Sequence, residues 1–304
     1  MAAQLIDGEK IAAGLKADLK AEVETLIKNG TIPHLKAVQV GGNPASRLYV
    51  KNQKKSCEEI GVAYTLDELP PDTIEEQLIE HIKKLNADKE TTGIILQMPL
   101  PTGINAQKVQ SLITPAKDVE GMNLVSMGAV VYGNARLAPC TAMAAVELIK
   151  SVGINLTGTE ATIVGRSAIV GKPVSLMLLD LHVTPTICHT RTKDISFHTK
   201  RADILIAATG KPETIRGNMV KPGAIVIDVG INRVPELDER GNQILDAKGK
   251  PKMKTVGDVV FDEAKEVAGY ITPVPGGVGP ITVVMLLRNT IEATKMTKSS
   301  FSPL

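Results

Sequence analysis

The chain has 304 residues, of which 43% are hydrophobic and 22% charged, and its formal net charge is +2. These values fit a soluble globular protein with room for two domains, and they give no electrostatic reason to expect binding to nucleic acid or to a membrane surface. The three cysteines are far apart, and there is no apolar signal core and no bilayer-length apolar run, so we expect a cytoplasmic protein without a disulfide framework or a metal site.

The first part of the chain alternates helical and strand patterns. Apolar residues recur every four positions from Ile11 to Ile27, Asp7 can cap this helix, and Gly30 closes it. The pattern then predicts strands over 35–40, 62–66 and 92–97, and helices over 45–60 and 72–85. We expect residues 1–140 to form an α/β lobe.

The second part also alternates, and its apolar runs have the character of buried parallel strands. They lie at 161–164, 182–188, 203–209 and 224–229, and a helix over 141–151 leads into them. This alternation predicts a doubly wound sheet over 141–278 that binds its ligand at the carboxyl ends of the strands. We expect a surface hairpin over 233–255, and a last helix from about 279 to 295, within a segment 279–304 that packs back on the first lobe.

The strand that ends at Val164 is followed by a glycine-led turn. Gly165 allows the turn, a helix is expected to begin near Ile169, and Gly171 lets that helix lie close to the strand. Free backbone N–H groups at such a turn can bind a phosphate. The spacing G-x-S-x-x-x-G-x-P differs from the common dinucleotide pattern, so by itself it leaves a plain strand-to-helix turn equally open.

The next strand ends in a basic stretch, His189 to Lys193, with no carboxylate before Asp194. An acidic residue at this place would bind a ribose 2′-hydroxyl, whereas cations favour a 2′-phosphate. We therefore expect NADP rather than NAD, although solvated surface charges remain an alternative. The predicted cofactor-binding residues in this region are Gly165, Arg166, Ser167, Thr190 and Arg191.

Three stretches of the first lobe are candidates for chemistry. Tyr49 and Gln53 lie four residues apart and share one face of a basic helix. Gln97 leaves a buried strand at its carboxyl end, and Glu120 belongs to a loop with two carboxylates. Each stretch also has a purely structural interpretation from the pattern alone. The helix with Tyr49 and Gln53 can be a solvated basic helix, Gln97 can mark a plain strand exit, and the loop with Glu120 can be a surface turn.

A fourth candidate is the loop from Tyr270 to Thr282, which contains three prolines and three glycines within a few positions. Such a segment cannot form the interior of a helix or a strand. A rigid loop with few side chains allows close backbone approach by a flat ligand, so we interpret it as functional.

Taken together, these stretches resemble the methylenetetrahydrofolate dehydrogenase/methenyltetrahydrofolate cyclohydrolase family over nearly the whole chain. The resemblance is carried by Tyr49 and by the segments 93–101, 117–121, 139–141, 164–173, 221–232, 256–259 and 271–280. It implies a homodimer of two α/β lobes with a folate cleft between them, and NADP near the Gly165–Ser167 turn and Ile231. It also implies hydride transfer from methylenetetrahydrofolate, then hydrolysis of the methenyl product to 10-formyltetrahydrofolate.

The resemblance assigns roles to single residues. Tyr49 matches the tyrosine that stacks on the folate, Gln97 matches the active-site glutamine, and Pro275 and Gly276 match the loop that lines the cleft.

The chain also departs from the family's pattern. Gln53 stands where the family has its catalytic lysine, and Glu120 stands where it has an aspartate that binds the pterin. Ala142 and Ala144 stand where a proline and a glycine are expected after Thr141.

A carboxamide cannot exchange protons as a desolvated lysine does. We therefore expect NADP-dependent methylenetetrahydrofolate dehydrogenase activity with weak or absent cyclohydrolase activity, and with Tyr49, Gln53, Gln97 and Glu120 in the catalytic site. The alternatives are a one-carbon transferase that uses bound methylenetetrahydrofolate, an ordinary bifunctional enzyme, and a folate-binding relative without catalysis.

Overall fold

The computed structural model describes residues 2–42, 44–238, 240–246 and 249–299. The chain forms two compact units, one from residues 1–11 and 144–281 and the other from 12–143 and 282–304. The unit boundaries fall within three helices, α1 (Gly8–Lys28), α6 (Cys140–Ser151) and α10 (Val278–Ser299). The first is called the sheet-A unit and the second the sheet-B unit.

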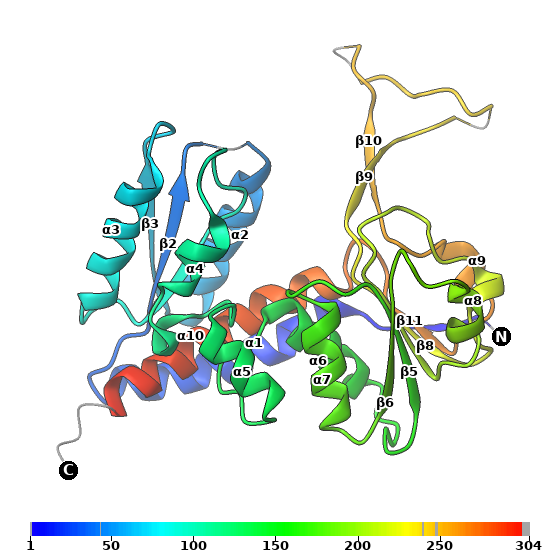
Figure 1. Ribbon diagram of the computed structural model, residues 1–304, viewed down its shortest axis with the longest axis horizontal. Coiled ribbons are helices and arrows are strands. Elements are labelled where there is room, and N and C mark those ends of the chain that lie inside the picture. The colour runs from blue at the N-terminus through cyan, green and yellow to red at the C-terminus, as the bar shows by residue number, and fades with distance from the viewer. Residues whose placement is uncertain (1, 43, 239, 247–248, 300–304) are drawn as a thin grey trace. The chain divides into compact units, whose positions relative to one another are not determined.

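The sheet-A unit is built on a six-stranded, wholly parallel sheet with the strand order β1-β11-β8-β7-β5-β6. Its strands are β1 (Gln4–Leu5), β5 (Glu160–Val164), β6 (Thr184–Cys188), β7 (Ile204–Ala207), β8 (Ile225–Asp228) and β11 (Tyr270–Ile271). Its other helices are α7 (Gly171–Leu179), α8 (Ile195–Thr199), η2 (Gly217–Met219) and α9 (Phe261–Lys265). Figure 1 shows α7 on one face of this sheet and α8 and α9 on the other.

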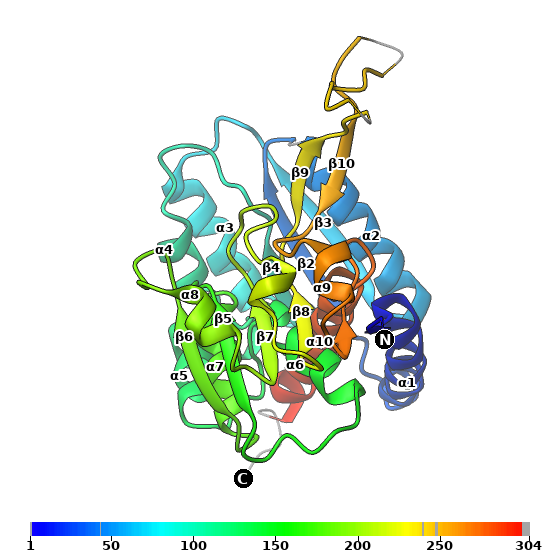
Figure 2. The same ribbon diagram turned by 90° about the vertical axis from the view of Figure 1, so that its right-hand side faces the viewer.

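Both faces of the central strands are apolar, which explains why each reads as a continuous hydrophobic run. All four residues of β7 and of β8 are buried, as expected for a parallel sheet covered on both sides. Because all strands are parallel, the loops after β5, β6, β7, β8 and β11 meet at one edge of the sheet. Figure 2 shows β6, β5, β7 and β8 side by side.

The segment between β8 and α9 confirms the predicted hairpin. Strands β9 (Asn232–Pro235) and β10 (Met253–Val256) pair antiparallel, and Figure 1 shows this ribbon projecting from the sheet-A unit.

The sheet-B unit has a three-stranded parallel sheet with the order β3-β2-β4. Its strands are β2 (His34–Val40), β3 (Ala63–Leu69) and β4 (Gly93–Leu96), and its helices are α2 (Pro44–Ile60), α3 (Glu75–Ala87), α4 (Ala106–Ser111), η1 (Pro115–Lys117) and α5 (Leu124–Val131). Figure 1 shows α3 and α2 on opposite faces of this sheet. One core cluster joins β2 and β4 to α3 and α4, with Val38, Leu78, Ile82, Ile94 and Val109 fully buried.

The structure confirms the predicted α/β class and moves several boundaries. The strand expected at 62–66 runs on to Leu69 because β2 offers pairing partners as far as Val40. The strand expected from His182 begins at Thr184, since the His182 backbone is left-handed with φ 61° and belongs to a turn. The helix expected near Ile169 begins at Gly171, and the last helix continues to Ser299. The Asp7 cap is confirmed, because its carboxylate accepts the Lys10 backbone N–H at 3.0 Å.

No helix in the described part of the chain combines the length and apolar character needed to cross a membrane. Nor does any cluster of three or more His, Cys, Asp or Glu residues suited to a metal ion occur within those residues.

Candidate functional site

Two buried glutamines form the centre of a polar site in the sheet-B unit. Gln53 lies on α2 and is completely buried, and Gln97 follows β4 directly and is 4% exposed. The Gln97 Nε2 donates a hydrogen bond of 2.8 Å to the Gln53 Oε1, and the Tyr64 hydroxyl donates to the same oxygen at 3.5 Å. The structure therefore brings together two predicted residues that are 44 positions apart.

One polar atom of this site lacks a partner. The Gln53 Nε2 is buried and makes no hydrogen bond within the described residues. Leaving a buried donor unsatisfied costs about 1–3 kcal/mol, so in native proteins such a group nearly always has a partner from the protein, water or a ligand. The free N–H group is a donor available to a ligand with an acceptor atom.

Tyr49 lies one helical turn before Gln53 and presents its ring to the same side. It is 39% exposed, yet burial around its hydroxyl raises the pKa of Tyr49 to about 12. Cys140 and Glu120 interact electrostatically with this hydroxyl and also raise the pKa of Tyr49. Tyr49 is therefore neutral at ordinary pH, and its aromatic ring lies near Gln53 and Glu120.

Glu120 follows η1 and is partly buried. Burial raises the pKa of its carboxyl to about 8, the Asp118 carboxylate raises this pKa further, and the Leu96 backbone N–H and the Gln110 side chain oppose the rise. Because Leu96 is the residue before Gln97, Glu120 lies beside the glutamine pair. Near neutral pH much of this carboxyl is protonated and can donate a hydrogen bond.

The loop that carries Glu120 is held from several directions, so it is not a plain surface turn. The buried Asp118 accepts hydrogen bonds from the Asn123 backbone N–H at 2.7 Å and from the Ser126 hydroxyl at 2.8 Å. Lys117 donates to three backbone carbonyls at the end of α3. Gly121 has φ +67°, and a Cβ there would overlap the Ala138 backbone, so only glycine fits.

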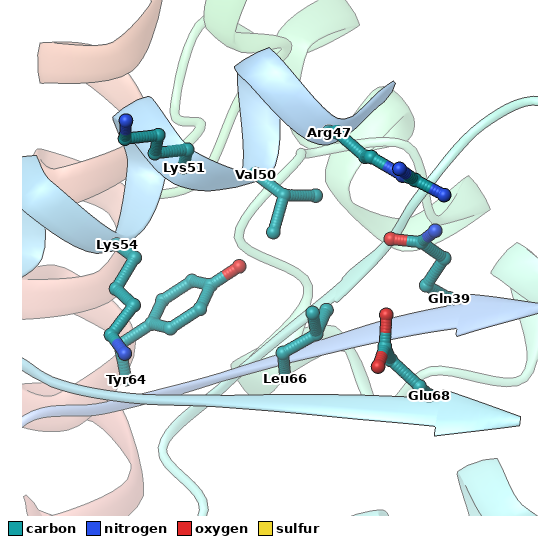
Figure 3. A pocket seen from close by; sticks show the side chains of 8 residues that line it. All are labelled: Gln39, Arg47, Val50, Lys51, Lys54, Tyr64, Leu66 and Glu68. Carbon is teal, nitrogen blue, oxygen red and sulfur yellow. The ribbon is translucent and has the colours of Figure 1, made fainter. Parts of the chain in front are cut away.

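The lysines beside Gln53 are paired with glutamates of the same helix. Lys54 and Lys55 are exposed and form i,i+4 pairs with Glu58 and Glu59 at 3.9 and 3.8 Å. Lys54 lines a pocket of about 290 Å³ between α2 and strands β2 and β3, where Figure 3 shows it near Tyr64. Lys54 and Lys55 therefore belong to a solvated basic face of α2, one of the interpretations that the sequence left open.

The glycine-led turn lies in the sheet-A unit, between β5 and α7. Gly165 has φ +139°, and a Cβ there would overlap the Ala208 carbonyl oxygen. A Cβ at Gly171 would overlap the Gly165 carbonyl oxygen, which explains the second glycine. The Ser167 hydroxyl accepts the Val170 backbone N–H at 3.1 Å, so the turn is internally braced.

The predicted cations lie at the same edge of the sheet. The Gly165 backbone N–H donates to the Cys188 carbonyl at 2.9 Å, which joins the turn to the end of β6. Arg166, Thr190 and Arg191 are exposed beside this junction. Asp194, the next acid along the chain, instead caps α8 by accepting the Phe197 backbone N–H at 3.0 Å.

The remaining predicted residues follow β8 and β11. Ile231 is 71% exposed directly after the β8 loop. Pro275 and Gly276 lie in the loop between β11 and α10, where Gly276 has φ +102°. A Cβ on Gly8 would overlap the Gly277 carbonyl oxygen, so the start of α1 packs directly on this loop. These residues and the glutamine pair belong to different units.

Sequence reasoning missed Tyr64 and a pair of buried aspartates, Asp228 and Asp258. Tyr64 sits within a strand without any local signal of a polar role, and only the fold brings it to Gln53. For Asp228 a signal was available, namely a carboxylate at the end of an apolar run followed by glycine.

Two family models together cover most of the chain. Residues 6–120 match the tetrahydrofolate dehydrogenase/cyclohydrolase catalytic domain, and residues 139–298 match the NAD(P)-binding domain of the same family. The chain belongs to the tetrahydrofolate dehydrogenase/cyclohydrolase family.

Bacterial members of the family resemble this chain closely along its length. It is 46% identical to the bifunctional protein FolD of Acetivibrio thermocellus over 296 residues, which are 97% of this chain and 98% of the relative. It is 47% identical to the bifunctional protein FolD of Moorella thermoacetica, covering 97% of this chain and 100% of the relative.

Solved structures of tetrahydrofolate dehydrogenase/cyclohydrolase proteins share the fold. The bifunctional FolD enzyme of Campylobacter jejuni matches with a TM-score of 0.89 and 40% identity, over 97% of this chain and 99% of the other. The Trypanosoma brucei FolD, solved in complex with NADP cofactor and inhibitor, matches with a TM-score of 0.89 and 34% identity, over 99% of this chain and 100% of the other.

Proposed function

We propose that this protein oxidises 5,10-methylenetetrahydrofolate to 5,10-methenyltetrahydrofolate with NADP, and that its cyclohydrolase activity is weak or absent. Family membership supports the dehydrogenase part, and the Trypanosoma brucei relative binds NADP. The observation that carries the second part is the buried Gln53 carboxamide, hydrogen-bonded to Gln97, at the position of the expected lysine.

The residues at the edge of the parallel sheet fit a dinucleotide with a 2′-phosphate. The turn at Gly165 has no room for a side chain, as a phosphate-binding turn requires. Arg166 and Arg191 supply exposed cations, and Asp194 is engaged in capping. NADP, when bound, supplies the hydride acceptor.

The site residues of the sheet-B unit suit a reduced pterin. The Tyr49 ring offers a stacking surface. The partly protonated Glu120 can both donate and accept hydrogen bonds, as an aminopyrimidine edge requires. The free Gln53 Nε2 gives one further donor. Pro275 and Gly276 are assigned to the substrate through the family resemblance.

The two reactions differ in the proton transfers that they need. Oxidation removes a hydride from the methylene carbon and leaves a methenyl cation between two nitrogens, so no side chain has to exchange a proton. Hydrolysis adds a water molecule that must lose a proton, and ring opening requires a proton at a folate nitrogen. Gln53 can position groups for the first reaction but cannot titrate for the second.

One observation favours an ordinary bifunctional enzyme as the second candidate. The pKa of Glu120, about 8, makes this carboxyl a proton carrier close to the same site. If Glu120 serves in place of a lysine, methenyl hydrolysis would proceed at an ordinary rate in the unmodified protein.

The experiment compares the two activities in the wild type and in Gln53→Lys. Purified protein is given methylenetetrahydrofolate and NADP, and reduced cofactor and the decay of methenyltetrahydrofolate are followed separately. We expect NADPH formation by the wild type with little methenyl decay above the uncatalysed rate. Gln53→Lys should raise methenyl hydrolysis by roughly 100-fold or more, the range of general acid–base catalysis.

Lys54→Gln is the matched control, because it exchanges the same two residue types on the neighbouring exposed face. It should leave both activities unchanged. Brisk methenyl hydrolysis by the wild type would contradict the proposal and favour the bifunctional candidate. Tight folate binding without NADPH formation would contradict the dehydrogenase and favour transfer of the one-carbon unit or binding alone.

We also propose a homodimer, as the family resemblance implies, and a cytoplasmic location, as expected from the sequence. In the sheet-B unit β3 is an edge strand with pairing on one side only, which is a surface open to another chain. Analytical ultracentrifugation measures the mass in solution, and a monomer at micromolar concentration would contradict this proposal.

A further inference from the structure

Two buried aspartates of the sheet-A unit organise the loops at the edge where the dinucleotide is expected. Asp258 is completely buried and Asp228 is 4% exposed. Neither has a lysine or arginine partner among the ion pairs of the described residues, and both accept hydrogen bonds from N–H donors instead. A buried carboxylate surrounded by N–H donors is a costly arrangement that needs every donor in place.

The Asp258 carboxylate joins two loops. Its Oδ2 accepts the backbone N–H groups of Thr209 and Gly210, after β7, at 2.5 and 2.9 Å. Its Oδ1 accepts the Asn232 Nδ2, after β8, at 2.8 Å. A Cβ on Gly230 would overlap the Asp258 carboxylate, so glycine at this position is what allows the approach.

Asp228 in turn holds the segment that carries Asp258. Its Oδ1 accepts the backbone N–H groups of Gly230 and Asp258, each at 2.9 Å. Its Oδ2 accepts the Val259 backbone N–H at 2.9 Å. A Cβ on Gly257 would overlap the Asp228 carboxylate, so the two carboxylates approach the chain through two glycines.

The consequence concerns Ile231, the exposed residue between these anchors. Its preceding neighbour Gly230 is held by Asp228, and its following neighbour Asn232 is held by Asp258. The two neighbours of this exposed apolar residue are thus each held by a hydrogen bond to a buried aspartate, at the carboxyl edge of the sheet. A hydrophobic surface fixed in this way is suited to contact a flat ring.

We propose that Asp258 is a positioning residue for the dinucleotide, acting through the 230–232 segment and the loop after β7. It does not contact the reacting atoms but fixes the backbone against which the cofactor lies. This inference rests on the proposed dinucleotide site and goes beyond it, because it names the group that sets the shape of that site.

Asp258→Asn tests the proposal with almost no change in volume. The asparagine keeps one acceptor oxygen and adds an NH₂ group, which must face either the two N–H groups of the β7 loop or the Asn232 amide. We expect the KM and Kd for NADP to rise about tenfold or more, with kcat and the Kd for methylenetetrahydrofolate changed much less. Calorimetric titration with NADP measures the Kd without any catalysis.

Asp238→Asn is the matched control. Asp238 also accepts backbone N–H bonds, from Arg240 and Asn242 at 2.9 Å each, but it lies in the exposed β9–β10 ribbon. This variant should bind NADP like the wild type. Asn232→Ala is the second test variant, because it removes one donor to Asp258 and leaves the β7 loop bonded. It should weaken NADP binding severalfold without lowering the melting temperature by more than a few degrees.

The outcomes separate the two proposals. A wild type that fails to bind NADP overturns the proposed function. A wild type that binds NADP, with Asp258→Asn equal to it, overturns the positioning role of Asp258. If Asp258→Asn does not melt cooperatively, the test of the positioning role rests on Asn232→Ala. Unchanged NADP affinity in Asn232→Ala then overturns the inference.

Discussion

At the scale of single residues, Gln53 and Gln97 act as a hydrogen-bonded pair. A glutamine amide has a donor end and an acceptor end, whereas a protonated lysine can only donate. In this chain the Gln97 Nε2 donates to the Gln53 Oε1. A lysine at position 53 would have to meet the oxygen of Gln97 instead, so the Gln97 amide would turn over. One substitution therefore reverses the hydrogen-bonding polarity of its neighbour as well.

Glu120 gives a prediction for stability against pH. Its pKa is about 8 in the folded protein and 4.5 is the ordinary value, so between these values the folded state keeps a proton that the unfolded chain releases. The contribution of Glu120 to stability is therefore complete below about pH 4.5 and is lost as the pH rises through 8. Urea unfolding at pH 5 and pH 8.5 should show Glu120→Gln gaining stability relative to the wild type at the higher pH.

The exposed Glu58→Gln serves as the control for removing a carboxylate from the surface of the same unit. A stability difference between wild type and Glu120→Gln that stays the same at both pH values would contradict a raised pKa at Glu120.

At the scale of elements, the turn from β5 to α7 depends on glycine for packing. Gly171 is the first residue of α7, and a Cβ on it would overlap the Gly165 carbonyl oxygen. The sequence pattern located this turn correctly because a buried strand before glycine is a local signal. It placed the helix start two residues early because the contact that requires Gly171 lies across the turn.

Gly171→Ala should therefore destabilise the protein and weaken NADP binding. The new methyl group overlaps backbone, which cannot rotate away, so we expect the free energy of unfolding to fall by about 1–3 kcal/mol. Gly14→Ala makes the same chemical change in α1, where a Cβ meets no atom within 4 Å. There we expect a gain of about 0.5–1 kcal/mol, since alanine favours a helix interior. Equal effects of the two substitutions in urea unfolding would contradict the packing argument.

At the scale of the whole molecule, a ligand that binds only the folded protein stabilises it by mass action. At a concentration about 100 times its Kd, the gain is about 2.7 kcal/mol. At equal concentrations NADP should raise the melting temperature more than NAD does, because the exposed guanidinium groups of Arg166 and Arg191 can pair with a 2′-phosphate. In differential scanning fluorimetry, Arg191→Ala should reduce the difference between the melting-temperature shifts caused by NADP and by NAD. An equal shift by both cofactors in the wild type would count against the predicted preference.

Sequence periodicity located the central strands and the first helix because it is a local property. The buried runs of β5, β7 and β8 and the four-residue repeat of α1 each carry their own signal. Ends of elements were less predictable, since β3 continues only because β2 offers it partners. The partnership of Gln53 with Tyr64 was beyond prediction, because nothing near either residue in the chain refers to the other.

The sequence by itself determined the α/β class, the family, and the absence of a lysine at position 53. These follow from residue identity, spacing and hydrophobic period, which are written along the chain. Only the tertiary structure decided that Gln53 is buried with an unused donor, that burial raises the pKa of Glu120, and that the two neighbours of Ile231 are bonded to Asp228 and Asp258. Burial and hydrogen-bond partners come from segments that meet only on folding, so the protonation and orientation of a side chain are properties of the fold.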